Sequence, residues 1–154
     1  MFGFGSGNVE IRSPNSVISS SVQYFHLEYI IINLYSLLAV APMLHTLEAG
    51  FVIPDLELDR SYPRLLYLER LWIALSSITW IQMTILLSLF PRLTYFKIIA
   101  SRLNNDMADG YAWAQLLQHI EHFEFELEFN SNVFEQQPLN LDSFRTKFWL
   151  EEKK

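Results

Sequence analysis

The sequence contains no cysteine among its 154 residues. Disulfide bonds, thiolate catalysis and cysteine-ligated metal sites are therefore excluded, while the redox compartment stays open. Basic residues are also scarce relative to acidic ones, and the formal net charge is −6. Residues 1–105 hold seven Lys or Arg against seven Asp or Glu, whereas residues 106–154 hold four against ten. The acidic last third argues against nucleic acid as a partner.

Two further features are missing. Residues 1–23 lack the basic segment followed by an apolar core that marks a secretory signal, and we expect them to form an N-terminal arm. We also find no motif that would run a reaction. The sequence therefore predicts a protein that is not an enzyme and that has no cofactor and no metal site.

The longest segment without charge is Leu71–Phe90, which reads LWIALSSITWIQMTILLSLF. As an α-helix, a segment of this length spans about 30 Å, the thickness of the hydrocarbon core of a bilayer. Charged residues or a helix breaker close it at both ends, since Glu69 and Arg70 precede it and Pro91 and Arg92 follow it. We therefore predict a transmembrane helix over about residues 71–90.

A second apolar segment covers residues 24–47 and predicts another span, with an interfacial or re-entrant helix as the alternative. The connection between the two segments would complete a helical hairpin, whose orientation stays open because the flanking positive charges nearly balance. After the second span, residues 92–103 predict an amphipathic helix at the level of the lipid headgroups. Its cations Arg92, Lys97 and Arg102 would contact anionic lipid such as cardiolipin.

Together these segments predict an all-α membrane protein in three parts. Residues 1–23 form the N-terminal arm, residues 24–105 form the membrane region, and residues 106–154 form an acidic extramembrane helix and tail. One run conflicts with this reading, because Phe123–Phe129 (FEFELEF) alternates strictly between apolar and acidic residues, as an edge strand does. We favour a helix as far as about Phe123 and leave the remainder open.

Two sets of residues are expected to mediate packing. Small and polar residues of the two spans would let another helix approach closely, namely Asn33, Ser36, Ala74, Ser77, Thr84 and Ser88. About 49 residues rarely build a stable core alone, so aromatic residues of the last third would dock on a partner. The residues chosen for this docking are Trp113, Phe123, Phe129, Phe148 and Trp149.

The histidines suggest metal or haem chemistry only weakly. His26 and His45 would lie at opposite ends of one helix, about 28 Å apart, so they could not ligate one iron without a histidine from a partner. His119 and His122 lie near Glu121, but their spacing matches neither HExxH nor the Glu-x-x-His of di-iron bundles. A solvated acidic face is the simpler interpretation of that cluster.

We expect a non-catalytic accessory subunit of a large energy-transducing membrane complex. The mitochondrial inner membrane is the favoured location, either in a respiratory-chain complex or in the ATP synthase, with other integral membrane subunits as partners. One alternative is a membrane anchor that binds haem or quinone through His26 or His45. The other is a small oligomeric transporter or channel built around Ser77, Thr84 and Ser88.

Overall fold

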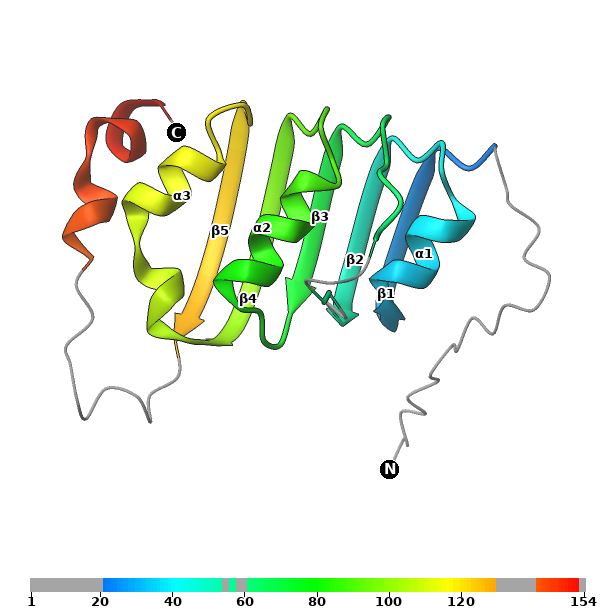
Figure 1. Ribbon diagram of the computed structural model, residues 1–154, viewed down its shortest axis with the longest axis horizontal. Coiled ribbons are helices and arrows are strands. Elements are labelled where there is room, and N and C mark those ends of the chain that lie inside the picture. The colour runs from blue at the N-terminus through cyan, green and yellow to red at the C-terminus, as the bar shows by residue number, and fades with distance from the viewer. Residues whose placement is uncertain (1–20, 54–55, 58–60, 130–140, 153–154) are drawn as a thin grey trace.

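The computed structural model describes residues 21–53, 56–57, 61–129 and 141–152. Within this part of the chain, five parallel strands form one sheet in chain order. The strands are β1 (Tyr24–Asn33), β2 (Thr46–Ile53), β3 (Arg70–Leu75), β4 (Tyr95–Leu103) and β5 (His122–Phe129). Helices α1 (Leu34–Val40), α2 (Trp80–Ser88) and α3 (Gly110–Leu116) all lie on one face of this sheet (Figure 1). Three short helical turns complete the fold, η1 (Asn105–Ala108), η3 (Asp142–Arg145) and η4 (Phe148–Glu152).

The predicted all-α membrane hairpin is wrong. The segment Leu71–Phe90 folds as most of β3, a loop and α2, while residues 24–47 contain β1, α1 and the start of β2. Residues 92–103, predicted as an interfacial helix, instead hold β4. No helix among the described residues is long and apolar enough to cross a bilayer. The structure thus contradicts both the membrane fold and the membrane location inferred from it.

The error has a physical cause in the central strand β3. Strands of parallel sheets read as nearly continuous apolar runs instead of alternating ones. In β3, Leu71, Ile73 and Leu75 point into the core, while the residues between them on the opposite face, Trp72 and Ala74, are also uncharged. A strand and a helix that follow each other without a charged loop therefore mimic one long apolar helix.

The boundary between β3 and α2 is set by a capping box. The Thr79 hydroxyl accepts a hydrogen bond from the backbone N–H of Gln82 at 3.2 Å, and the Gln82 side chain accepts one from the backbone N–H of Thr79 at 3.0 Å. These two bonds satisfy donors that the first turn of a helix leaves free. The helix ends at Ser88, three residues before Pro91. The apolar run is therefore interrupted in its middle by a helix start.

The chain is a succession of similar strand units. Four backbone carbonyls, each just before a strand, accept two N–H groups from the start of the next unit; they belong to Gln23, His45, Glu69 and Thr94. The first residues of the five strands are in register and roughly 22–27 residues apart, within the range of repeat proteins. Each unit therefore stacks on the preceding one, as in a solenoid.

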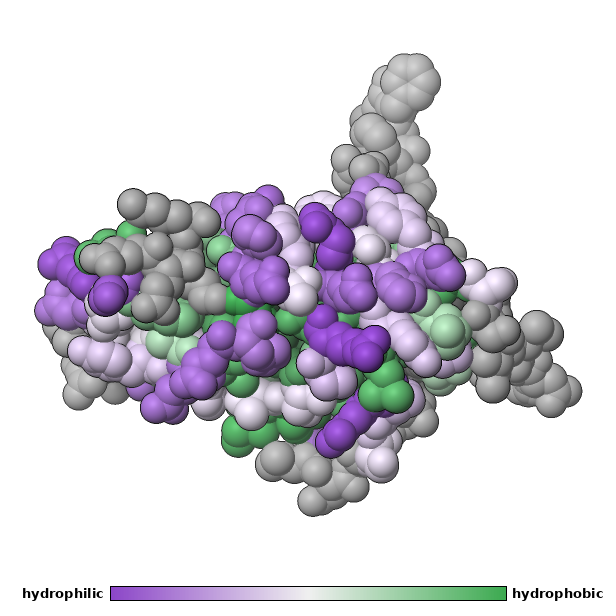
Figure 2. Space-filling model, turned by 90° about the horizontal axis from the view of Figure 1, so that it is seen from above, coloured by the Kyte–Doolittle hydropathy of each residue, from purple (hydrophilic) through white to green (hydrophobic). Residues whose placement is uncertain are grey.

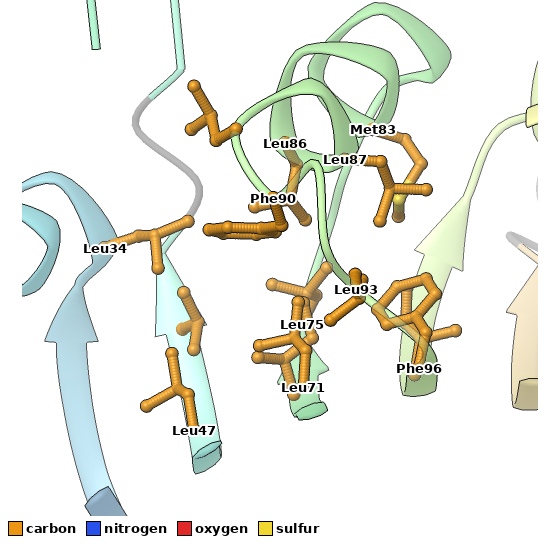
Figure 3. Close-up of a cluster of buried hydrophobic side chains, with 14 of the residues drawn as sticks. Leu34, Leu47, Leu71, Leu75, Met83, Leu86, Leu87, Phe90, Leu93 and Phe96 are labelled. Carbon is orange, nitrogen blue, oxygen red and sulfur yellow. The ribbon is translucent and has the colours of Figure 1, made fainter. Parts of the chain in front are cut away.

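One apolar core runs through the stacked units. Met83, Leu86 and Leu87 of α2 point toward the sheet, where they meet side chains that include Leu71 and Leu75 (Figure 3). Between β2 and β3, a connection takes the place of a helix on the same side of the sheet. Its Leu65, Leu68 and Leu56 are buried in the core, and the backbone N–H of Leu65 bonds to the Leu89 carbonyl at 3.0 Å.

The C-terminal turns, residues 142–152, close one end of the solenoid, and we term them the C-terminal clasp. The Trp149 indole donates to the Gly110 carbonyl at 3.0 Å, and the Gly110 N–H donates to the Ser143 hydroxyl at 2.8 Å. The ring of Phe125 lies against those of Phe144 and Trp149, with centroids 5.9 and 5.5 Å away. The ambiguous run Phe123–Phe129 is thus a strand, and the clasp contacts the rings of its Phe123 and Phe125.

Candidate binding surface on the open sheet face

The strands present alternate side chains on the face of the sheet that lies away from the helices, since successive residues of a strand point to opposite faces. No described helix lies on that face (Figure 1). We term it the open face. Strand register assigns to it Tyr24, His26, Thr46, Glu48, Arg70, Trp72, Ala74, Tyr95, Lys97, Ile99, His122, Glu124, Glu126 and Glu128.

A row of side chains crosses the open face perpendicular to the strands. It consists of His26, Glu48, Trp72, Lys97 and Glu124, each paired in register with the next. Neighbouring strands are about 4.8 Å apart, so the row extends for about 19 Å. Residues far apart in the sequence are therefore combined into one continuous surface.

One end of the row is held by Glu48. Its carboxylate accepts a hydrogen bond from the Tyr24 hydroxyl at 3.1 Å and lies 2.7 Å from Nδ1 of His26. The side chains of His26 and Glu48 are 37% and 32% exposed, so the pair is screened by solvent only in part. These two contacts orient Tyr24 and His26 of β1 against Glu48 of β2.

The other end of the row is held by Glu124. This carboxylate accepts a hydrogen bond from the Tyr95 hydroxyl at 2.7 Å and one from Nζ of Lys97 at 2.8 Å. The hydrogen bond from Lys97 lowers the pKa of Glu124, and the bond from Tyr95 adds to that effect. The same bonds to Glu124 raise the pKa of Lys97 and of Tyr95. Every shift moves the group away from neutral pH, so Glu124 and Lys97 stay charged.

The face is completed by Arg70, whose guanidinium carbon lies 4.3 Å from the centre of the Tyr95 ring. This cation–π contact places the guanidinium over the aromatic ring. Among the described residues, Arg70 makes no ion pair with a carboxylate. Its charge is therefore positioned by an aromatic neighbour and remains exposed.

Trp72 stands between the Glu48 and Lys97 positions, at the middle of the row. Its Nε1 atom is buried, yet it has no hydrogen-bond partner within the described part of the chain. Buried indole N–H groups usually find an acceptor. Trp72 thus combines a large aromatic surface with an unsatisfied donor at the centre of the open face.

The expected lipid-binding cations do not form a common surface. Arg92 is exposed in the loop before β4, and Lys97 lies on the open face in its pair with Glu124. Arg102 is exposed in β4, where its φ of 56° lies in the left-handed region and the pairing with β5 is irregular. Of the three, only Lys97 belongs to the open face.

The expected helix-packing residues are distributed over several elements. Asn33 ends β1, Ser36 lies in α1, Ala74 lies in β3 and Ser77 is exposed in the following loop. The remaining two, Thr84 and Ser88, lie in α2. Their hydroxyls donate to carbonyls of their own helix, to Trp80 at 3.0 Å and to Ile85 at 2.6 Å. The six residues therefore come from two strands, a loop and two short helices, and not from two long helices that face each other.

Four of the five aromatic residues expected to dock on a partner contact one another within this chain, two of them buried and two partly buried. The buried ring of Trp113 stacks on Phe123 with centroids 5.8 Å apart, and Phe123 lies 6.0 Å from Trp149. Phe148 in turn lies 5.0 Å from Trp149 in the C-terminal clasp. Phe129, at the end of β5, also packs against the core. These contacts join α3, β5 and the clasp.

The histidines lie at or near the starts of strands, and His26 and His45 are not the two ends of one long helix. His26 lies in β1 and His45 precedes β2, where its Nδ1 lies 3.9 Å from Glu69. His119 and His122 are both exposed near the start of β5. Within the described ranges, no group of three or more His, Asp or Glu residues could hold a metal ion.

Sequence reasoning missed the open face, although a signal for it was present. Each of the five units carries two apolar residues on the helix side of the sheet, separated by one position, as in Phe25-x-Leu27, Leu71-x-Ile73 and Phe96-x-Ile98. The residue between them points to the opposite face. Reading that middle position in five successive units yields His26, Glu48, Trp72, Lys97 and Glu124, which is the row described above.

The fold and this surface define a class of protein, a parallel-strand solenoid with one sheet face free of described helices. No family model matches the chain, and comparisons with curated proteins and with solved structures give no significant match.

Proposed function

We propose that the chain is a non-catalytic binding module that holds another protein on the open face. The observation that carries the proposal is the position of α1, α2 and α3 on the same side of an all-parallel sheet (Figure 1). Purely parallel sheets occur almost only with both faces covered. A partner protein is the cover that the open face lacks among the described elements.

The repeat pattern supports this proposal. Leu68-x-x-Leu71-x-Ile73-x-x-Ser76-x-Ile78 and its counterpart starting at Leu93 resemble the leucine-rich-repeat pattern, with serine at the position usually held by asparagine or cysteine. The hydroxyl of Ser101, which occupies that position in the second unit, donates to the Ser76 carbonyl at 3.5 Å. Solenoids of this kind offer extended surfaces for binding other proteins.

The chemistry of the open face suits recognition better than catalysis. A general acid or base works best with a pKa near neutral pH, whereas the contacts of Glu124 move its pKa and that of Lys97 away from neutrality. Trp72 supplies the kind of central aromatic residue that dominates binding energy in protein interfaces. Fixed charges around it would set the orientation of the partner.

This proposal keeps one part of the function expected from the sequence, the non-catalytic role in binding other proteins. The expected membrane complex depended on two transmembrane helices, which the structure replaces with strands and short helices.

Site-specific photo-crosslinking tests the proposal. A photoreactive phenylalanine analogue at Ile99 of β4, on the open face, should crosslink to a protein from an extract of the source cells. The same analogue at Ile81, which is 51% exposed on α2, serves as the matched control and should not crosslink. Trp72→Ala should reduce crosslinking from Ile99. Equal products from both positions, or products from Ile81 alone, would exclude the open face as the binding surface.

A further inference from the structure

Two carboxylates distinguish the β5 side of the open face from the rest of it. Glu126 and Glu128 are exposed, and neither makes an ion pair or a side-chain hydrogen bond within the described part of the chain. In contrast, the carboxylates of Glu48 and Glu124 are each held by two donors. At this margin the two carboxylates lack an ion-pair partner in the described part of the chain, and the charge of Lys97, which is paired with Glu124, acts on Glu126 only through space.

An apolar strip leads from the centre of the face to this margin. Ala74, Ile99 and Glu126 are in register on β3, β4 and β5, and Trp72 lies two residues before Ala74 on the same side. Along this row the neighbour of Glu126 is therefore the aliphatic Ile99 and not a cation. A ligand that fits the strip needs an apolar group over Ile99 and a positive charge over β5.

The charge of the whole chain favours the same ligand. All of the net charge of −6 belongs to residues 106–154, which contain β5. A one-signed potential of this kind attracts oppositely charged partners and accelerates their association. Arg70, an exposed cation of the face, is held on Tyr95 and lies two strands away from Glu126, with an offset of about 13 Å along the strand direction.

We infer that the partner is a protein segment that carries lysine or arginine next to apolar side chains, and that it crosses the open face from Trp72 to β5. Its apolar groups pack on Ala74 and Ile99, and its cations pair with Glu126 and Glu128. The inference rests on the proposed function and adds the chemistry of the partner to it.

Peptide binding tests the inference with the full chain. The probe is a short fluorescent peptide of alternating lysine and leucine, and the matched probe has glutamate in place of lysine. Fluorescence anisotropy should show binding of the lysine peptide at least about tenfold tighter than that of the glutamate peptide, a difference of about 1.4 kcal/mol. Equal affinities, tighter binding of the glutamate peptide, or no binding of the lysine peptide would overturn the inference.

A pair of charge reversals separates the site from the overall charge. Glu126→Lys and Glu121→Lys change the net charge equally at exposed positions, but Glu121 lies before β5 and outside the open face. Glu126→Lys should reduce the affinity for the lysine peptide by at least about tenfold, and Glu121→Lys should reduce it by less than about twofold. Circular dichroism checks that both variants fold. Equal weakening by the two variants would overturn the inference, because it would leave only long-range attraction.

The same variants distinguish this inference from the proposed function. If Glu126→Lys abolishes crosslinking from Ile99 to the natural partner, the inference is supported. If crosslinking from Ile99 still depends on Trp72 but is unchanged in Glu126→Lys, the basic-partner inference is wrong while the open face remains the binding surface.

Discussion

Individual side chains on the open face are fixed by contacts between neighbouring strands. Glu124 shows this most clearly, since its two oxygens hold Tyr95 and Lys97 of β4 at once. Such cross-strand pairs are the units that stabilise a sheet. They also keep charged groups at defined positions before a partner arrives, which lowers the cost of ordering them on binding.

Glu124 predicts a specific pH dependence of stability. Because the folded-state contacts lower its pKa below the ordinary 4.5, its contribution is present above that value and is lost as the pH falls through the folded-state pKa. The Tm of the native protein should therefore fall more on acidification below about pH 4.5 than the Tm of Glu124→Gln does. Thermal unfolding across this pH range measures the difference.

The matched control for this prediction is Glu121→Gln. Glu121 is exposed and makes no ion pair with a described residue. The Tm of Glu121→Gln should therefore fall on acidification as much as the Tm of the native protein does. If the Tm of Glu124→Gln and of the native protein fell equally on acidification, the carboxylate would not hold Lys97 and Tyr95 in solution.

Gly110 lies so close to the C-terminal clasp that a side chain has no room there. A Cβ atom at this position would lie 2.6 Å from the Ser143 carbonyl carbon and 2.8 Å from the Phe144 nitrogen, both backbone atoms. Gly110→Ala should therefore displace the C-terminal clasp and cost about 1–3 kcal/mol, the usual range for overpacking. Urea unfolding measures the change in free energy of unfolding.

A second variant changes the clasp without changing the sequence of α3. Trp149→Phe removes the indole donor to Gly110 but keeps a ring at the site, and it should cost about 1 kcal/mol. If Gly110→Ala instead stabilised the protein, the gain in helix propensity would outweigh any contact with Ser143. The clasp would then not approach α3 as closely as the structure shows.

The local elements differ in how far the sequence could reveal them. The alternation in Phe123–Phe129 is typical of a strand, and the structure forms one there, although the sequence alone left the run open between helix and strand. The capping box of Thr79 and Gln82 was also readable, but it lies inside the apolar run Leu71–Phe90. Length and lack of charge cannot distinguish a span from a buried strand followed by a helix, since both remove apolar side chains from water.

The start of α2 can be tested with one hydroxyl. Thr79→Ala removes the acceptor for the Gln82 N–H and should lower the free energy of unfolding by about 1 kcal/mol, within the range of other N-cap losses. Thr84→Ala, in the exposed middle of the same helix, is the control and should change it by less than about 0.5 kcal/mol. Urea unfolding of the three proteins measures both effects, and equal effects would contradict the assigned helix start.

At the scale of the whole molecule, stacking of similar units explains both the core and the surface. Each unit buries apolar side chains such as Leu71 and Phe96 against its neighbours, and one cluster extends from Leu34 to Phe123. Hydrophilic side chains dominate the surface at the end where the strands begin (Figure 2). The acidic last third is not a separate appendage, because β5 extends the same sheet beyond residue 105.

The repeat is readable in the sequence as a periodicity over tens of residues. The unequal spacing of the units, and the substitution of Phe96 and Phe123 for leucine, weaken the signal. The surface network could not be predicted in detail. Pairs such as His26 with Glu48 depend on strand register, which joins residues that the sequence separates by a whole unit.

Neighbouring strands on the open face can be tested directly because the native chain has no cysteine. Ala74→Cys with Ile99→Cys places two thiols on register partners of β3 and β4, whose backbones are about 4.8 Å apart. Ala74→Cys with Glu126→Cys places them two strands apart, at about 10 Å. Dibromobimane becomes fluorescent only after both of its arms have reacted with thiols.

The parallel solenoid predicts rapid formation of the fluorescent product in the first pair and little product in the second. Denaturation in urea before labelling should abolish this difference. Equal labelling of both folded pairs, or labelling of the second pair alone, would contradict the sheet order and with it the open face.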